Sequence, residues 1–159
     1  MTVTGSESAA IKVRVSGNFN VISSITVTGS QASNTLIDIR GDSNAVGGFA
    51  VTASQEAIVS VSMMGDLNII VGGAITASQF SHATWSMNAK NKFTAATMTV
   101  SQKASGVVNA SGSSNDLTRM TLTASQTAQY TLNMPSDSFA DVGRTHTLTS
   151  GVTNINVPN

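Results

Sequence analysis

The residues best suited to catalysis or metal binding are few in this sequence, and their spacing matches no motif of known chemistry. The 159 residues include two histidines, His82 and His146, and no cysteine. The histidines lack the paired spacing of a zinc site, and neither a glycine-rich phosphate loop nor a Gly-x-Ser-x-Gly nucleophile motif occurs. We therefore expect a protein that is not an enzyme and has no catalytic residue, no cofactor and no metal site.

Two short segments match recognition motifs, and in the first of them Gly41 and Asp42 fall where the repeat requires turn residues. Arg40-Gly41-Asp42-Ser43 is the integrin-binding tetrapeptide, and Asn109-Ala110-Ser111 is a glycosylation sequon. Asp42 and Asp66 each stand in a Gly-Asp-x-Asn segment, which is typical of a turn and lacks the full pattern of a calcium-binding repeat. We interpret both motif matches as coincidental and the two aspartates as turn residues.

An internal repeat of about 24 residues runs through the chain, and two amide columns define it. The glutamine column is formed by Gln31, Gln55, Gln79, Gln102 and Gln126. The asparagine column is formed by Asn20, Asn44, Asn68, Asn91 and Asn115. Both columns have spacings of 24, 24, 23 and 24, and chance does not give two columns the same one-residue deletion. Amides stacked at strand spacing can hydrogen-bond along the stack, so we expect two amide ladders.

Apolar and threonine columns accompany the amides. One apolar column is Val3, Val27, Val51, Ile75, Met98, Leu122 and, after a step of 26, Leu148. The residues that follow it form an unbroken threonine column of Thr4, Thr28, Thr52, Thr76, Thr99, Thr123 and Thr149. A second strand contributes the apolar column Val13, Ile37, Val61, Trp85, Val108 and Leu132. Alternation along a strand places the apolar residues inward and the threonines outward.

These columns predict an all-β, single-chain parallel β-solenoid with about 24 residues per rung. Each rung is expected to hold three short strands and three turns, with roughly six to seven rungs in the chain. Residues 1–159 are expected to form one domain, with a last partial rung and tail from about residue 145.

Composition narrows the range of partners. The 8 basic and 8 acidic residues give zero net charge, and only 10% of the residues are charged. The basic residues are scattered singly, whereas phosphate backbones require clustered Lys and Arg. No apolar stretch reaches the length of a membrane helix. We therefore expect a protein partner, and neither nucleic acid nor membrane.

The threonine column has one specific functional interpretation. Outward Thr-x-Thr ranks, spaced about 7 Å along a strand and about 4.8 Å between rungs, resemble the surfaces of β-solenoid ice-binding proteins. The rank that precedes the apolar column is interrupted by Ala50 and Ala74, which breaks the regularity of such a surface. Threonine is also simply a good outward strand residue.

Two further resemblances point to assembly. The Ser-Gln and Gly-x-x-Asn columns resemble curli-type amyloid repeats, although a second glutamine column is missing. In style across its length, this cysteine-free, low-charge chain rich in Thr, Ser, Ala and Asn resembles the fibre, spike and decoration proteins of bacteriophage virions. That resemblance implies a mechanical role in the virion, with an extracellular location as the alternative.

The strand pattern begins at residue 2, so the first rung is expected to expose an edge that favours pairing with another chain. Association is also favoured by apolar residues at outward positions, such as Leu36, Met64, Leu67 and Val107. We therefore expect a homo-oligomer or docking onto a larger particle.

Overall fold

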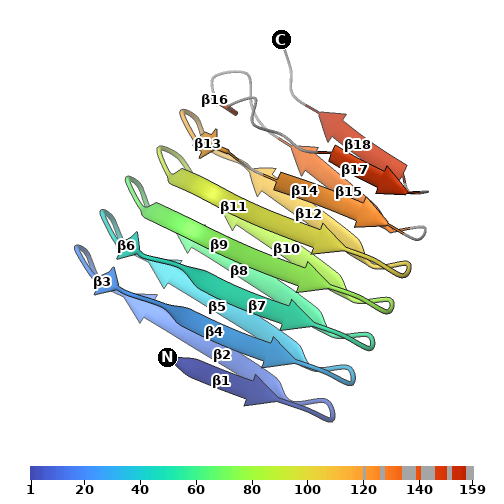
Figure 1. Cartoon of the computed structure of the whole chain (residues 1–159). Helices are drawn as coiled ribbons and strands as arrows, with labels where there is room; N and C mark the ends of the chain where they lie inside the picture. Colours follow the sequence, from blue (N-terminus) through green and yellow to red (C-terminus); the bar gives the residue numbers. More distant parts are fainter. Residues whose placement is uncertain (120, 126–127, 134–138, 141–145, 150–151, 157–159) are drawn as a thin grey trace.

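Strands about 24 residues apart pair in parallel, so the chain of the computed structural model coils as a β-solenoid of about five turns (Figure 1). The structure describes residues 1–119, 121–125, 128–133, 139–140, 146–149 and 152–156. The predicted all-β parallel solenoid and its rung length are confirmed, and the number of turns is close to the one expected.

Each rung contributes to two sheets that face each other across the core (Figure 1). The long strands of the sheet that we call sheet 1 are β1 (Thr2–Gly5), β4 (Ile25–Gly29), β7 (Phe49–Ala53), β9 (Ile69–Ala77), β11 (Lys92–Val100), β14 (Thr121–Ser125) and β17 (His146–Thr149). Its short strands are β3 (Val21–Ile22), β6 (Ala45–Val46), β13 (Asp116–Thr118) and β16 (Phe139–Ala140). Sheet 2 consists of β2 (Ala10–Ser16), β5 (Asn34–Arg40), β8 (Ile58–Met64), β10 (His82–Met87), β12 (Ser105–Ala110), β15 (Gln129–Asn133) and β18 (Val152–Asn156).

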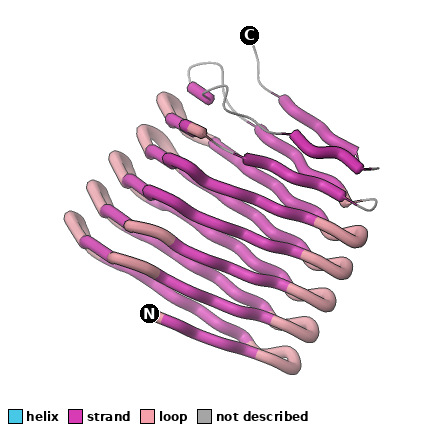
Figure 2. Tube along the Cα trace, viewed as in Figure 1, coloured by secondary structure: helices cyan, strands magenta, loops and turns pink. Residues whose placement is uncertain are grey.

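The expected three strands per rung are found where the third segment is a separate strand, as in β3, β6 and β13, but this segment belongs to sheet 1 and the expected third turn is not formed. In β9 and β11 it continues into the threonine strand without a break, whereas loops at residues 23–24 and 47–48 interrupt the two preceding rungs (Figure 2). At this junction each of the two strands has a single residue with positive φ, which is Gly72 (72°) in β9 and Ala95 (58°) in β11. A single left-handed residue kinks a strand but does not reverse it, so the cross-section is a flat two-layer rung.

The core lies between the sheets and is made of stacked like residues. From sheet 1, Val27, Val51, Ile75 and Met98 are buried, and from sheet 2, Ile37, Val61, Trp85, Val108 and Leu132 are buried. The side chain of Leu122 lies outside the described residues, although its backbone pairs with Met98. Each rung covers the apolar face of its neighbours, which a single rung cannot do alone.

Two kinds of turn close the rungs at the two edges of the solenoid (Figure 2). At one edge, which we call the glutamine edge, two consecutive residues have positive φ, as in Gln31 (53°) and Ala32 (60°). At the other, the asparagine edge, a glycine begins the turn in the first three rungs. A Cβ on Gly41 (φ 103°) or Gly65 (φ 129°) would lie 2.5 Å from the carbonyl oxygen of the stacked glycine, so these sites admit no side chain.

Candidate functional site

The outer face of sheet 1 is the most regular surface of the protein, and we call it the threonine face. Parallel pairing aligns Thr2 with Thr26 and Thr4 with Thr28. The same register continues through β7, β9, β11 and β14, so the threonines form two ranks that run along the solenoid axis. The inward residues between the ranks, such as Val27 and Ile75, are fully buried and hold the backbone flat from below.

A third hydroxyl rank borders the two threonine ranks and was not among the residues predicted for this surface. It consists of Ser6, Ser30, Ser54, Ser78, Ser101 and Ser125. These serines are at least partly exposed. Alternation counted two residues beyond each threonine would have found them. The segments that carry the three ranks contain only Thr, Ser, Ala, Gly and apolar residues, so this face presents hydroxyl groups without charge.

A shallow hollow interrupts the threonine face where Ala50 and Ala74 replace threonine. The glycine pairs 47–48 and 72–73 adjoin these alanines, and together they line a depression of about 430 Å³. Thr26 and Thr97 border the depression on the neighbouring rungs. The interruption seen in the sequence is therefore a place in the middle of the face where small residues leave a depression.

The last threonine of the predicted rank lies in a different register. The chain pairs Thr123 with Thr147 and Ser125 with Thr149, a step of 24 residues. The sequence-based step of 26, which aligned Leu122 with Leu148 and Thr123 with Thr149, is therefore wrong. Leu148 and Thr149 lie two residues beyond His146 and Thr147. Because side chains alternate with a period of two, the shifted pair has the same inward and outward positions and gave an apparent match.

The asparagine column forms a buried ladder at the turns of the asparagine edge. Asn20 Nδ2 donates to Asn44 Oδ1 (2.9 Å), and Asn44 Nδ2 donates to Asn68 Oδ1 (3.0 Å). The main-chain N–H groups of Asn68 and Asn91 continue the series by donating to Asn91 and Asn115 Oδ1. Asn44, Asn68, Asn91 and Asn115 are all at most 1% exposed, so this ladder satisfies buried polar groups inside the turn, with the exception of Asn68 Nδ2.

The glutamine column makes no such ladder among the residues that the structure describes. Gln31, Gln55, Gln79 and Gln102 occupy left-handed turn positions with exposed side chains, and Gln126 lies outside the described residues. Stacking there runs through the main chain, where the N–H of Ala32 donates to Gln55 O and that of Glu56 donates to Gln79 O. The prediction of two amide ladders was therefore wrong for this column.

The two motif matches are held in structural contacts. Asp42 Oδ1 accepts a hydrogen bond from the main-chain N–H of Asp66 (2.8 Å), and Arg40 Nε donates to Asp38 (2.8 Å). Asn109 Oδ1 accepts from Asn133 Nδ2 (2.7 Å), which makes a second, outward amide pair on sheet 2. The Asp42 carboxylate of the first motif and the Asn109 amide of the second are thus bonded to neighbouring rungs.

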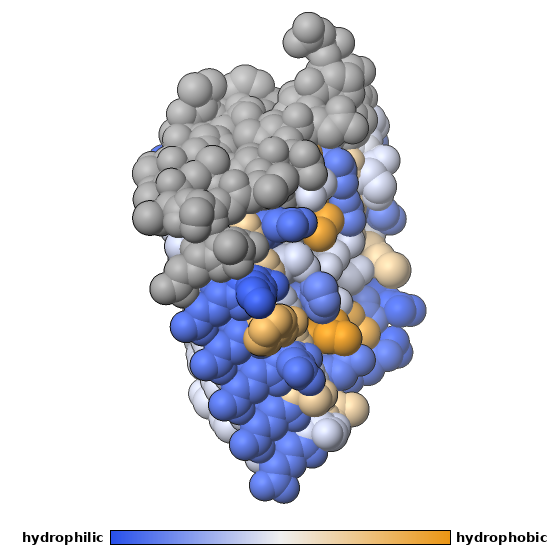
Figure 3. Space-filling model, turned by 90° about the vertical axis from the view of Figure 1, so that its right-hand side faces the viewer, coloured by the Kyte–Doolittle hydropathy of each residue, from blue (hydrophilic) through white to orange (hydrophobic). Residues whose placement is uncertain are grey.

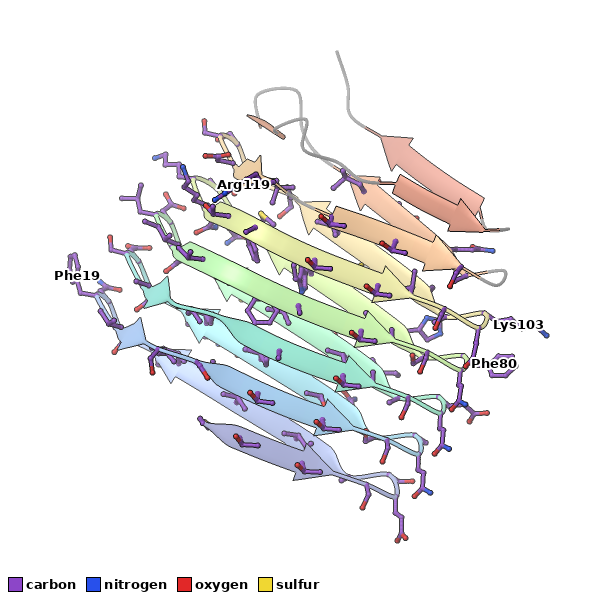
Figure 4. All side chains as sticks on the ribbon, viewed as in Figure 1. Phe19, Phe80, Lys103 and Arg119 are labelled. Carbon is purple, nitrogen blue, oxygen red and sulfur yellow. The ribbon has the colours of Figure 1, made fainter. Side chains whose placement is uncertain are left out.

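Polar and aromatic residues also meet where the glutamine edge joins sheet 2. His82 Nδ1 is hydrogen-bonded to the hydroxyl of Ser105 on the next rung. Lys103 Nζ lies 5.3 Å from the ring centroid of Phe80, and Figure 4 shows these two side chains together on adjacent turns. Figure 3 views this edge and shows a row of hydrophilic side chains broken by a few apolar ones.

Within the described ranges, no three His, Cys, Asp or Glu residues come together as metal ligands. None of the described segments is a helix long and apolar enough to cross a membrane. Comparison with known proteins yields no matching family model, no matching curated protein and no matching solved structure.

Proposed function

We propose that this chain is a non-enzymatic structural protein, a stiff β-solenoid that takes part in a larger protein assembly by self-association or by docking on a particle. A decoration, spike or fibre protein of a virion is the type of assembly that best fits its composition and repeat. An extracellular fibre is the alternative location. The stacked core columns and the asparagine ladder would make the solenoid stiff, and an outer surface would bind the neighbouring protein.

The observation that supports assembly is a group of exposed apolar side chains at the asparagine edge, which we call the apolar edge. It consists of Phe19, Val21, Leu67, Ile69 and Val71, which are 42–83% exposed. Figure 4 shows Phe19 projecting from its turn, away from the body of the solenoid. Large exposed apolar groups gathered at one edge are typical of a protein contact surface.

The apolar edge is also uneven, because its large side chains are separated by a rung of small residues. Pairing places Ala45 between Val21 and Ile69, and the adjoining turn and loop of the same rung contribute the small residues Ser43 and Gly47. Bulky apolar side chains on the first and third rungs therefore flank a rung of small ones. A partner's apolar side chain can insert into such a notch, which is how the centres of protein interfaces pack.

We expect the double variant Val21→Ser and Ile69→Ser to weaken assembly about tenfold or more, because it removes two large apolar side chains from the contact. Light scattering after size exclusion and electron microscopy measure the species present. Ile58→Ser is the matched control, since Ile58 is 44% exposed but lies on sheet 2. An unchanged oligomer in the double variant would contradict the role of the apolar edge. A wild-type protein that is monomeric at every concentration would eliminate self-association and leave docking on a particle.

Ice binding is a second candidate, favoured by the three uncharged hydroxyl ranks on the flat sheet 1. The hollow at Ala50 and Ala74 is what limits this surface as a template for ordered water. We expect Ala50→Thr with Ala74→Thr to complete the leading rank and to raise thermal hysteresis above that of the wild type. Thr52→Tyr, which protrudes from the same face, should abolish it. Absence of thermal hysteresis in wild type and completed variant alike would eliminate this candidate.

A curli-like fibre subunit is the third candidate, since the asparagines of the Gly-x-x-Asn turns that prompted that resemblance are hydrogen-bonded from rung to rung. Thioflavin binding and fibres in the same electron micrographs would distinguish it from a closed oligomer.

A further inference from the structure

Two arginines on the outer face of sheet 2 share one buried carboxylate. Arg14 Nε lies 3.1 Å and Arg40 Nε 2.8 Å from Asp38 Oδ2. The Asp38 side chain is 2% exposed, whereas those of Arg14 and Arg40 are 43% and 49% exposed. A buried carboxylate requires a compensating charge, and one arginine would neutralise it. The second leaves a net charge of +1 at this point.

The mode of contact leaves the recognising ends of both arginines free. Each guanidinium bonds Asp38 through Nε, and neither has another partner among the described residues. The two terminal NH₂ groups of each side chain therefore remain as donors to solvent. The carboxylate fixes the side-chain ends, so less rotamer entropy is lost when a ligand binds.

The register defines the surroundings of the pair. Arg14 is opposite Asp38, and Ser16 is opposite Arg40, so these four residues form the corners of one block on two adjacent strands. The arginines stand on one diagonal and the exposed Ser16 hydroxyl on the other. Lys12, also exposed, precedes Arg14 by two residues and so lies on the same face about 7 Å away.

We propose that Arg14 and Arg40, oriented by Asp38, bind a tetrahedral oxyanion, a phosphate or sulfate group. Guanidinium donors match the oxygen pairs of such groups, and two guanidiniums on a diagonal reach oxygens that do not lie in one plane. Ser16 supplies a third donor. The group is either a free ion or an ester on a larger molecule, and in the second case Lys12 contacts the next anionic group.

The test is a titration of ¹⁵N-labelled protein with inorganic phosphate and with sulfate, followed by NMR at the arginine Nε–H signals at constant ionic strength set with chloride. We expect saturable shifts of Arg14 and Arg40. Arg14→Gln and Arg40→Gln should each weaken binding about tenfold. Lys92→Gln, which removes a positive charge paired with Asp116 on sheet 1, should leave binding unchanged. Equal shifts in chloride, or no effect of the arginine variants, would overturn the proposal.

Asp38→Asn separates positioning from simple charge. It raises the net charge of the block, so attraction alone predicts tighter binding, whereas loss of the shared carboxylate predicts weaker binding. We expect weaker binding, and tighter binding would contradict the proposed geometry. Circular dichroism checks that this variant folds. Arg40→Lys, which keeps the charge but loses both the Nε contact and the planar fork, provides an independent test and should weaken binding nearly as much as Arg40→Gln.

A sulfated oligosaccharide identifies the source of the group. Binding at least tenfold tighter than that of sulfate, lost in Lys12→Gln, assigns the site to esters on a chain. Equal affinities assign it to the free ion. Since no residue of the apolar edge belongs to the arginine block, failure of anion binding would leave the assembly proposal standing.

Discussion

Replacing Trp85 by alanine is expected to cost about 3–5 kcal/mol in the free energy of unfolding, the largest loss of any single core substitution here. Trp85 projects from sheet 2 and is fully buried. Its ring stacks on Phe93 at 5.0 Å between centroids and meets Phe49 edge-on at 5.4 Å, and both phenylalanines belong to sheet 1. The substitution would remove the contact that joins the two layers at the centre of the solenoid. Chemical denaturation followed by far-ultraviolet circular dichroism measures the loss.

Two variants serve as controls for the Trp85 experiment. Trp85→Phe should cost much less, because the indole N–H has no hydrogen-bond partner in the buried site and nothing polar is lost with it. Thr76→Ala, on the threonine face, should change stability by less than about 0.5 kcal/mol. If Trp85→Ala were as stable as Thr76→Ala, the assignment of Trp85 to the core would be wrong.

Replacing Asn44 by alanine is expected to cost about 3 kcal/mol, because it removes hydrogen-bond partners from the rungs on both sides, in a site that is buried or part-buried. Asn44 Oδ1 accepts from the main-chain N–H and from Nδ2 of Asn20, at 3.0 and 2.9 Å. Its own Nδ2 donates to Gly41 O and to Asn68 Oδ1, at 2.9 and 3.0 Å. The loss should appear in the same denaturation experiment, and proteolysis should accelerate at the asparagine edge.

Gln55→Ala is the matched control for Asn44→Ala. Both residues are amides repeated every 24 residues, but Gln55 is exposed at the opposite edge, and its loss should cost less than about 0.5 kcal/mol. Similar losses of unfolding free energy for the two variants would mean that the glutamine column also stabilises the fold.

The fold could be predicted because every rung repeats the same pattern. Two amide columns with a shared deletion determine the period, and apolar residues such as Val61 and Trp85, one rung apart, follow it. The flat cross-section could not be predicted. The small residues at Gly47-Gly48 and Gly72-Gly73 have the composition of a turn, and only the observed backbone, with one left-handed residue at Gly72, shows a kink.

The two amide columns show where sequence reasoning about side chains fails. Asparagine and glutamine columns have the same spacing and similar chemistry, yet only the asparagines face inward. The direction depends on φ, since Gln31 sits at 53° in a tight turn that turns its side chain to solvent. The Arg14–Asp38 pair, in contrast, could have been predicted from the sequence, because the two opposite charges are one period apart.

The one-residue deletion in the fourth rung has a consequence for how such a chain can change over evolution. Met63 still pairs with Met87 and Asn68 still contacts Asn91, so the missing residue was taken from the turn between them. Turn length is thus free to vary while strand length is not. Because each rung contacts only its neighbours, an in-frame duplication or loss of one rung would alter the number of copies without disturbing the others. Selection could therefore adjust the extent of every surface column together, through copy number alone.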